Sequence, residues 1–237
     1  MKKAIEMLIR ELESKLGGYA ALLNYRYLNL CVKAEPVALL PVVIEDKDGD
    51  TQHIEDVART MLINQYQFEV IPMDQDMVFN ICKGFLTHHP EFKQEVVVSA
   101  EDHKLYQDIE NEKHIILTVP EVNEDRRDFL LESVKMLYDQ CKVQVDKTNA
   151  AYAAKLAAKV VGQSEEVIEE SKNKLEESQQ MYSDMIDKYL AAKQKEIEDA
   201  YQHYLNEQTA KKAAADEVEA ARGKHAGRQM RIGDTDE

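Results

Sequence analysis

Apolar residues recur every three or four positions in three long stretches of this chain. That spacing places apolar side chains on one face of an α-helix, so each stretch is predicted to be helical. The first helix is expected to run from residue 2 to about residue 34, because Pro36 disfavours helical backbone at the residue before it. The apolar positions are Ile5, Leu8, Leu12, Leu16, Tyr19, Leu23 and Leu30 in the first stretch, Leu130, Val134, Leu137, Cys141, Val145, Thr148, Tyr152 and Leu156 in the second, and Ile168, Leu175, Tyr182, Ile186, Tyr189, Ile197 and Tyr204 in the third.

Local signals mark where these helices weaken, begin and end. Gly17 and Gly18 each cost roughly 1 kcal/mol relative to Ala in a helix interior, which predicts a kink or a closely packed neighbour. Asn123 is a typical residue for capping the start of the second helix. Gly162 suits the left-handed residue that ends it, and the third helix is expected to begin at Ser164 and to reach about residue 221. The short link predicts that the second and third helices are antiparallel neighbours.

The segment between the first two helices has a different pattern, with β-branched runs separated by turn signals. A turn is predicted at residues 46–50, where Gly49 can adopt positive φ. A short helix is predicted after Asp74 or Asp76, either of which can cap it. The predicted strands are 42–44, 67–72, 96–98 and 114–119. This segment is therefore expected to be a small α+β module.

The predicted fold class is α+β, an antiparallel three-helix bundle with an inserted small α+β domain. Domain I comprises residues 1–35 and 121–221, domain II comprises residues 36–120, and residues 222–237 are expected to be a disordered tail. The two connections between the domains form a predicted hinge at Glu35, Pro36, Val119 and Pro120.

One polar residue, Lys193, interrupts the apolar stripe of the third helix. A lysine there is expected to lay its aliphatic stem along the seam of the bundle while its ammonium group stays in water.

Charge and composition limit the possible functions. The chain carries 45 acidic and 30 basic residues, a net charge of −15, which disfavours unspecific attraction to nucleic acid. The cysteines Cys31, Cys82 and Cys141 lie far apart and are expected to be free thiols in a reducing cytoplasm. No run approaches the ~18 apolar residues of a membrane span, so no membrane association is expected.

No arrangement of residues typical of an enzyme is found. The sequence has no paired carboxylates, no nucleophile with an adjacent base and no phosphate-binding loop, so no catalytic residue, small-molecule substrate or cofactor is predicted. His88 and His89 are candidate metal ligands by residue type. Since no Cys or carboxylate lies at ligand spacing in the sequence, they are expected to be an ordinary loop pair and no metal is predicted.

Several segments, in a shared order, carry a family resemblance. Val119-Pro120 followed by Glu124, Arg126 and Arg127 is similar to the "V-P-x-L-T-E-E-R-R" junction of ribosome recycling factors. The segments 33–45, 68–74, 164–165 and 193–197 also resemble motifs of that family, and the likeness covers roughly residues 1–205.

The resemblance implies a non-enzymatic translation factor of the cytoplasm. Members of the family act on the ribosome after termination together with elongation factor G. The implied partners are therefore the ribosome, through large-subunit rRNA, and elongation factor G.

One departure from the family pattern affects the function expected. Asp146, Asn149 and Ala150 occupy the arginine positions of the family's "V-R-N-x-R-R" segment, which contacts ribosomal RNA. Asp and Asn cannot replace a guanidinium group in binding phosphate. The prediction is a divergent paralogue with weakened or altered ribosome binding. The alternative is a protein-interaction or regulatory module that kept the fold and does not act on the ribosome.

The remaining basic residues are the candidates for contact with ribosomal RNA. Those on the helices could instead form an ordinary solvated face. Arg126 and Arg127 could equally pair with Glu124 or Asp128. The candidate contact residues are Lys33, Arg126, Arg127, Lys142, Lys147, Lys155 and Lys159.

Overall fold

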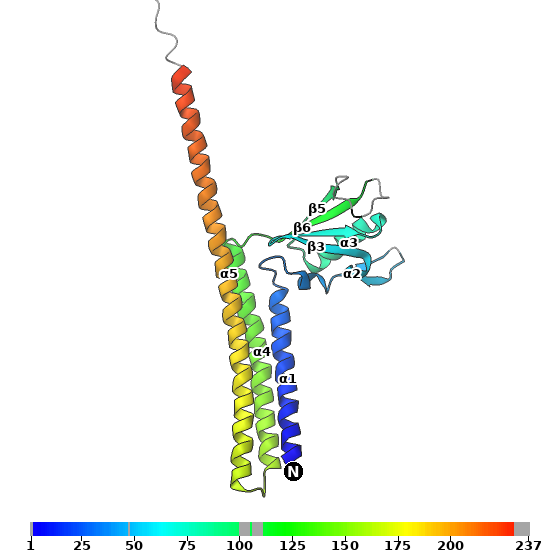
Figure 1. Ribbon diagram of the computed structural model, residues 1–237, viewed down its shortest axis with the longest axis vertical. Coiled ribbons are helices and arrows are strands. Elements are labelled where there is room, and N and C mark those ends of the chain that lie inside the picture. Colours follow the sequence, from blue (N-terminus) through cyan, green and yellow to red (C-terminus); the bar gives the residue numbers. More distant parts are fainter. Residues whose placement is uncertain (1, 47, 100–104, 106–110, 230–237) are drawn as a thin grey trace, which may run out of the picture.

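Three helices form a bundle in the computed structural model, which describes residues 2–46, 48–99, 105 and 111–229. They are α1 (Lys2–Leu28), α4 (Glu124–Lys159) and α5 (Glu165–Gln229). α4 runs antiparallel to the other two, which confirms the predicted bundle (Figure 1). The predicted apolar stripes supply its core, with Leu12, Val145, Ile186 and Ile197 fully buried.

The first helix ends at Leu28, so the prediction that it continues to about residue 34 was wrong. Cys31 has a φ of 46°, a left-handed conformation that α-helix cannot include. Gly17 marks a close approach and not a kink, because α1 is continuous through it. A Cβ atom at Gly17 would lie 3.4 Å from the Tyr182 hydroxyl oxygen, whereas nothing lies within 4 Å of one at Gly18.

The ends of the other two helices follow their sequence signals. The Asn123 side chain accepts a hydrogen bond from the backbone N–H of Arg126 at 2.9 Å and caps α4. Gly162, with a φ of 78°, turns the chain into α5. α5 reaches Gln229 and projects well past the other two helices (Figure 1). Residues 222–229 are thus helical, which corrects the prediction of disorder there, and residues 230–237 lie outside the described part.

The inserted segment forms two antiparallel sheets. A four-stranded sheet has the order β3-β4-β6-β5, and β1 pairs with β2 in a hairpin. The elements are η1 (Pro36–Leu39), β1 (Val43–Glu45), β2 (Thr51–His53), α2 (Ile54–Val57), β3 (Ala58–Asn64), β4 (Gln67–Pro72), η2 (Gln75–Met77), α3 (Val78–His88), β5 (Lys93–Val98) and β6 (Lys113–Thr118). α3 packs tightly on β1, because a Cβ atom at Gly84 would lie only 2.4 Å from Ile44 Cδ1.

Four of these strands, β1, β4, β5 and β6, confirm the strands predicted from the sequence, whereas β2 and β3 were missed. β3 is an edge strand whose residues are exposed except for Ala58, so it lacks the apolar alternation that identifies a half-buried strand. Asp74 caps η2, the turn of 3-10 helix that leads into α3, by accepting a hydrogen bond from the Asp76 N–H at 2.9 Å; α3 itself has no side-chain cap.

The two connections between bundle and inserted segment separate two hydrophobic cores. Val32 and Val122 pack in the bundle core, whereas Ala34 and Val119 pack in the core of the inserted segment. Both connections also bond to the turn between β3 and β4. The Ala34 N–H donates to the carbonyl oxygen of residue 65, and the Val119 N–H donates to that of residue 66, each at 2.8 Å.

No helix within the described ranges is long and apolar enough to cross a membrane.

Candidate functional site

The four candidate lysines of α4 do not share one face of the helix. With 3.6 residues per turn, Lys142 and Lys147 lie roughly 140° apart around the helix, and Lys155 and Lys159 roughly 40° apart. The Lys142 ammonium donates to Ser183 Oγ at 3.1 Å and lies 3.9 Å from the Asp146 carboxylate. The other three are exposed. The structure therefore does not gather them into one basic strip.

At the positions where ribosome recycling factors have arginines, this chain presents few hydrogen-bond donors. Asp146 is exposed, and Lys142 is its cationic neighbour on the helix. Ala150 is exposed and has no polar side chain. The Oδ1 atom of Asn149 is buried without a hydrogen-bond partner among the described residues. This part of α4 therefore offers a carboxylate and an amide where phosphate binding calls for guanidinium groups.

Arg127 is held by contacts within the protein. Its Nη2 and Nε atoms lie 2.6 and 2.9 Å from the Asp128 carboxylate. Its guanidinium carbon also lies 4.4 Å from the centroid of the Tyr201 ring, a cation–π contact with α5. Pairing with Asp128 was one of the two roles left open by the sequence.

Arg126 lies at the junction between the bundle and the inserted segment. Its Nη2 atom donates to the carbonyl oxygen of Cys31 at 3.2 Å, and burial lowers the pKa of its guanidinium. This contact joins the first turn of α4 to the connection that follows α1. The geometry gives Arg126 a structural partner that the sequence did not indicate.

Lys193 is a second buried cation in this region. Only 5% of its side chain is exposed, and its ammonium lies 3.1 Å from Glu196 Oε2. The expectation that the ammonium stays in water was therefore wrong. An ion pair on the same helix compensates its burial instead.

Lys33 lies beside a groove at the predicted hinge. The groove encloses about 400 Å³ between the first connection, the β3–β4 turn and α5, and Tyr66, Lys195 and His203 also line it. Lys33 is exposed and Lys195 pairs with Asp199 at 2.6 Å. Of the hinge residues, Val119 is buried, Glu35 and Pro120 are partly buried, and Pro36 is exposed.

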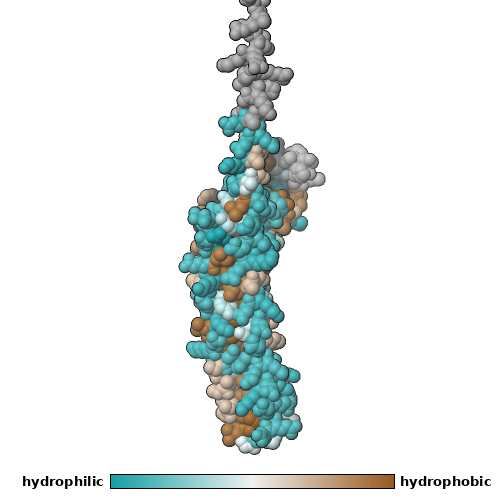
Figure 2. Space-filling model, turned by 90° about the vertical axis from the view of Figure 1, so that its left-hand side faces the viewer, coloured by the Kyte–Doolittle hydropathy of each residue, from teal (hydrophilic) through white to brown (hydrophobic). Residues whose placement is uncertain are grey.

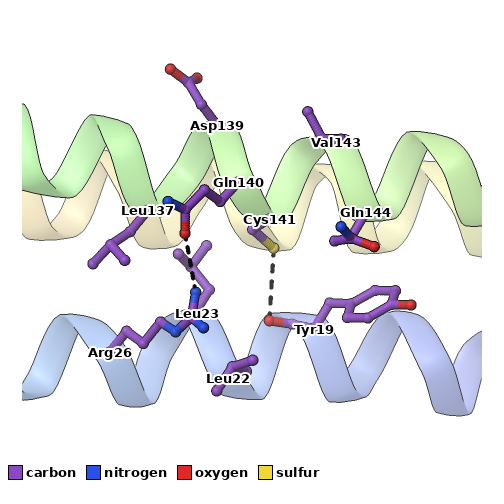
Figure 3. A pocket seen from close by; sticks show the side chains of 10 residues that line it. All are labelled: Tyr19, Leu22, Leu23, Arg26, Leu137, Asp139, Gln140, Cys141, Val143 and Gln144. Atoms are coloured by element: carbon purple, nitrogen blue, oxygen red, sulfur yellow. Dashed lines mark hydrogen bonds between the residues drawn. The ribbon is translucent and has the colours of Figure 1, made fainter.

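A larger groove of about 600 Å³ lies between α1 and α4 (Figure 3). Leu22 and Leu137 line it with Cys141, whose thiol lies 3.7 Å from the carbonyl oxygen of Tyr19. Burial raises the pKa of the Cys141 thiol, which disfavours the reactive thiolate form. On the face presented in Figure 2, apolar side chains form small separate patches on a mostly hydrophilic surface.

Sequence reasoning missed a cluster beside Arg126. Cys31, His89 and Glu91 bring a thiol, an imidazole and a carboxylate together at the same junction. Burial raises the pKa of the Cys31 thiol to about 12. No spacing in the sequence could have indicated this group, because Cys31 is separated from the other two by most of the inserted segment.

Comparison with known proteins identifies the family. The sequence pattern of the family described as "Ribosome recycling factor" matches residues 28–197. A solution structure of the ribosome recycling factor is similar with a TM-score of 0.63 and 20% identity, covering 84% of this chain and 100% of that one. A model of the T. thermophilus factor, built with E. coli elongation factor G on the E. coli post-termination complex, gives 0.50 and 19%, covering 83% and 98%. No curated protein sequence matches significantly. Since the family match spans most of the chain and the bundle with its inserted α+β segment is the same fold, this chain belongs to the ribosome recycling factor family.

Proposed function

We propose that this chain is a non-enzymatic, translation-associated protein of the cytoplasm. It binds the ribosome more weakly than family members that have arginines at the positions of Asp146, Asn149 and Ala150. Family membership supports the link to translation. The observation that carries the weakened binding is the surface of α4, where Asp146 and Ala150 are exposed and Asn149 supplies only an amide.

Electrostatics supports weak binding to a polyanion. A hydrogen bond to a charged group is worth roughly 1.5–3 kcal/mol, so losing two or three such contacts weakens binding by several powers of ten. Asp146 adds repulsion from phosphate. The lysines do not compensate, since Lys142 is engaged with Ser183 and Asp146, and Lys147 faces another direction from Lys155 and Lys159.

We propose further that the two hydrophobic cores correspond to two domains, residues 1–35 with 121–221 and residues 36–120, joined at Glu35, Pro36, Val119 and Pro120. The separation of the cores supports this division. The similar structure that places a recycling factor with elongation factor G on a ribosomal complex supports the same partners for this chain. Lys33 and the α4 lysines are the contact residues that the sequence predicts.

A second candidate function is a protein-interaction or regulatory module. The net charge of −15 favours it, as does the projection of α5 beyond the bundle, which gives the chain a surface away from the predicted RNA contacts.

Ribosome co-sedimentation at several salt concentrations tests the proposal. Asp146→Arg, Asn149→Arg and Ala150→Arg combined should raise ribosome affinity at least 10-fold and steepen its salt dependence. The matched control is Asp216→Arg, Gln208→Arg and Ala215→Arg, which changes the net charge equally at exposed sites on α5. Tight, salt-sensitive binding by the unmodified chain would contradict the proposal, and equal gains by both triple variants would show a nonspecific charge effect. No ribosome binding by any form would favour the second candidate.

A further inference from the structure

Three potential metal ligands meet at the junction between the bundle and the inserted segment. The Sγ atom of Cys31, a ring nitrogen of His89 and a carboxylate oxygen of Glu91 all lie within 4.8 Å of one another. Cys31 is fully buried, His89 is 6% exposed, and 34% of the Glu91 side chain is exposed. The group is therefore an enclosed pocket of donors with one side open to solvent.

The hydrogen bonds of His89 select one tautomer of its ring. Its Nε2 atom lies 2.8 Å from the carbonyl oxygen of Ala38, and a carbonyl only accepts, so Nε2 carries a hydrogen. In the neutral ring, Nδ1 then presents a lone pair. Metal-binding histidines typically donate their other N–H to such a carbonyl, which fixes the ring and raises its basicity. The ring is also stacked on Phe92, with centroids 4.5 Å apart.

The Nδ1 lone pair faces another acceptor. Glu91 Oε1 lies 3.3 Å from it, so this contact is favourable only if a proton or a cation lies between the two atoms. Tetrahedral zinc, with bonds of 2.0–2.1 Å to nitrogen and oxygen, places two ligands about 3.4 Å apart. The observed separation already matches that value. The ligand atom of Cys31, Sγ, lies within 4.8 Å of the other two residues' ligand atoms and must move to the ~3.6 Å that separates sulfur and nitrogen on one tetrahedral zinc ion.

We propose that Cys31 Sγ, His89 Nδ1 and Glu91 Oε1 bind one divalent transition-metal ion of the zinc class, with a solvent molecule in the fourth position. The thiol transfers its proton to solvent as the sulfur–metal bond forms, and any proton on Nδ1 is released in the same way. The thiolate and carboxylate together then cancel the charge of the ion.

The surrounding charges are compatible with this arrangement. Arg126 and Lys193 face Cys31 and favour its thiolate, whereas the carboxylates of Glu91, itself a proposed ligand, and Glu35 oppose it. Neither cation needs the proposed ligands as its sole partner, because Arg126 donates to the Cys31 carbonyl and Lys193 pairs with Glu196. Cys31 has a φ of 46°, which is a strained backbone conformation for a residue other than glycine. Such conformations are enriched at functional sites.

A bound ion would join the first connection, which follows α1, to the link between α3 and β5. His89 and Glu91 lie between α3 and β5, whereas Cys31 follows α1. Because the Cys31 side chain packs in the core of the inserted segment, the ion would hold the start of the first connection against that core. This consequence does not depend on ribosome binding.

Metal binding by the purified full chain tests the proposal. Zn²⁺ is titrated against a chromophoric chelator, and Co²⁺ is titrated with absorption spectroscopy, which reports thiolate ligation as a charge-transfer band and tetrahedral geometry as intense d–d bands. We expect one equivalent of each metal and a charge-transfer band. Cys31→Ser, His89→Gln and Glu91→Gln should each weaken Zn²⁺ binding at least about 100-fold, since loss of an outer partner alone costs 10- to 100-fold.

The matched controls are Cys82→Ser, His88→Gln and Glu95→Gln, which should bind like the unmodified chain. Circular dichroism and thermal unfolding establish that each variant is folded. If Cys31→Ser does not fold, the double variant Cys82→Ser with Cys141→Ser decides the question, because a retained cobalt–thiolate band must then come from Cys31. Absence of stoichiometric binding, a spectrum without thiolate ligation, or equal binding by the ligand variants and controls would overturn the proposal.

Discussion

The guanidinium of Arg126 donates a hydrogen bond to the backbone carbonyl of Cys31 at 3.2 Å, and so ties the first turn of α4 to the chain leaving α1. This hydrogen bond lies at the junction between the core of the bundle and the core of the inserted segment. Its neighbour Arg127 makes its contacts on the surface, with Asp128 and Tyr201. Two adjacent arginines with the same chemistry therefore serve different parts of the fold.

The first prediction compares these two arginines. Arg126→Ala should lower the free energy of unfolding by about 1.5–3 kcal/mol, since it removes a charge-assisted hydrogen bond in a buried setting. Arg127→Ala should cost measurably less, because its ion pair with Asp128 is screened by solvent. Urea denaturation of both variants measures the difference, and equal losses would show that Arg126 has no special role at the junction.

A second prediction concerns the bundle core. Ile186 is fully buried, so Ile186→Ala should cost about 2–5 kcal/mol. Leu137 belongs to the predicted apolar stripe of α4, but it lines the α1–α4 groove and is only partly buried. Leu137→Ala should therefore cost about half as much, since less apolar area is lost from the protein interior. Chemical denaturation tests the order, and a larger loss at Leu137 would contradict the described helix orientation.

The third prediction uses two glycines with opposite surroundings. Gly18→Ala should stabilise the protein by about 0.5–1 kcal/mol, because the added Cβ meets nothing and Gly is unfavourable within a helix. Gly84→Ala should destabilise it, since its Cβ would collide with Ile44 Cδ1 at 2.4 Å and approach the Val43 carbonyl oxygen at 3.0 Å. Thermal unfolding measures both effects, and stabilisation by Gly84→Ala would refute the tight packing of α3 on β1.

A fourth prediction concerns alkaline pH. Burial raises the pKa of Tyr27 above its ordinary value near 10, and its hydroxyl donates to the Val134 carbonyl oxygen at 3.1 Å. Since the folded pKa is raised, this contribution to stability is complete below pH ~10 and is lost as pH rises further and the unfolded phenol ionises. Urea titrations between pH 8 and 12 should show a shallower alkaline loss for Tyr27→Phe than for the unmodified chain. Parallel pH profiles would count against this burial effect.

The fifth prediction is cellular. The unmodified chain should fail to sustain growth of a cell depleted of its ribosome recycling factor, because α4 lacks the arginine donors expected to bind ribosomal RNA. Growth after depletion, with protein levels verified by immunoblotting, is the measurement. Full rescue would show that the substitutions at Asp146, Asn149 and Ala150 carry less weight than we assign them.

Features encoded by short-range patterns could be predicted from the sequence. The three apolar stripes, the Asn123 cap and the left-handed Gly162 each act within a few residues, and all appear as expected. The end of α1 could not be predicted, because a cysteine adopts the left-handed conformation that usually belongs to glycine. The edge strand β3 was missed since it buries almost nothing.

The candidate site was less accessible to sequence reasoning because it depends on tertiary contacts. Nothing local to Arg126 indicates that it will reach the carbonyl of Cys31. The sequence predicts no metal at His89 because no Cys or carboxylate lies at ligand spacing, yet folding brings Cys31 into the same cluster. The ribosome-contact residues themselves remain predictions.

The projection of α5 has a mechanical consequence. Its 65 residues correspond to a rod of about 98 Å, whereas the 36 residues of α4 span about 54 Å. A rod of that length acts as a lever. A rotation of about 10° around the lower end of the bundle would sweep the far end of α5 through roughly 17 Å. A small rotation of the bundle, one that leaves the side-chain contacts at its lower end unchanged, would therefore become a large displacement at the opposite end of the molecule.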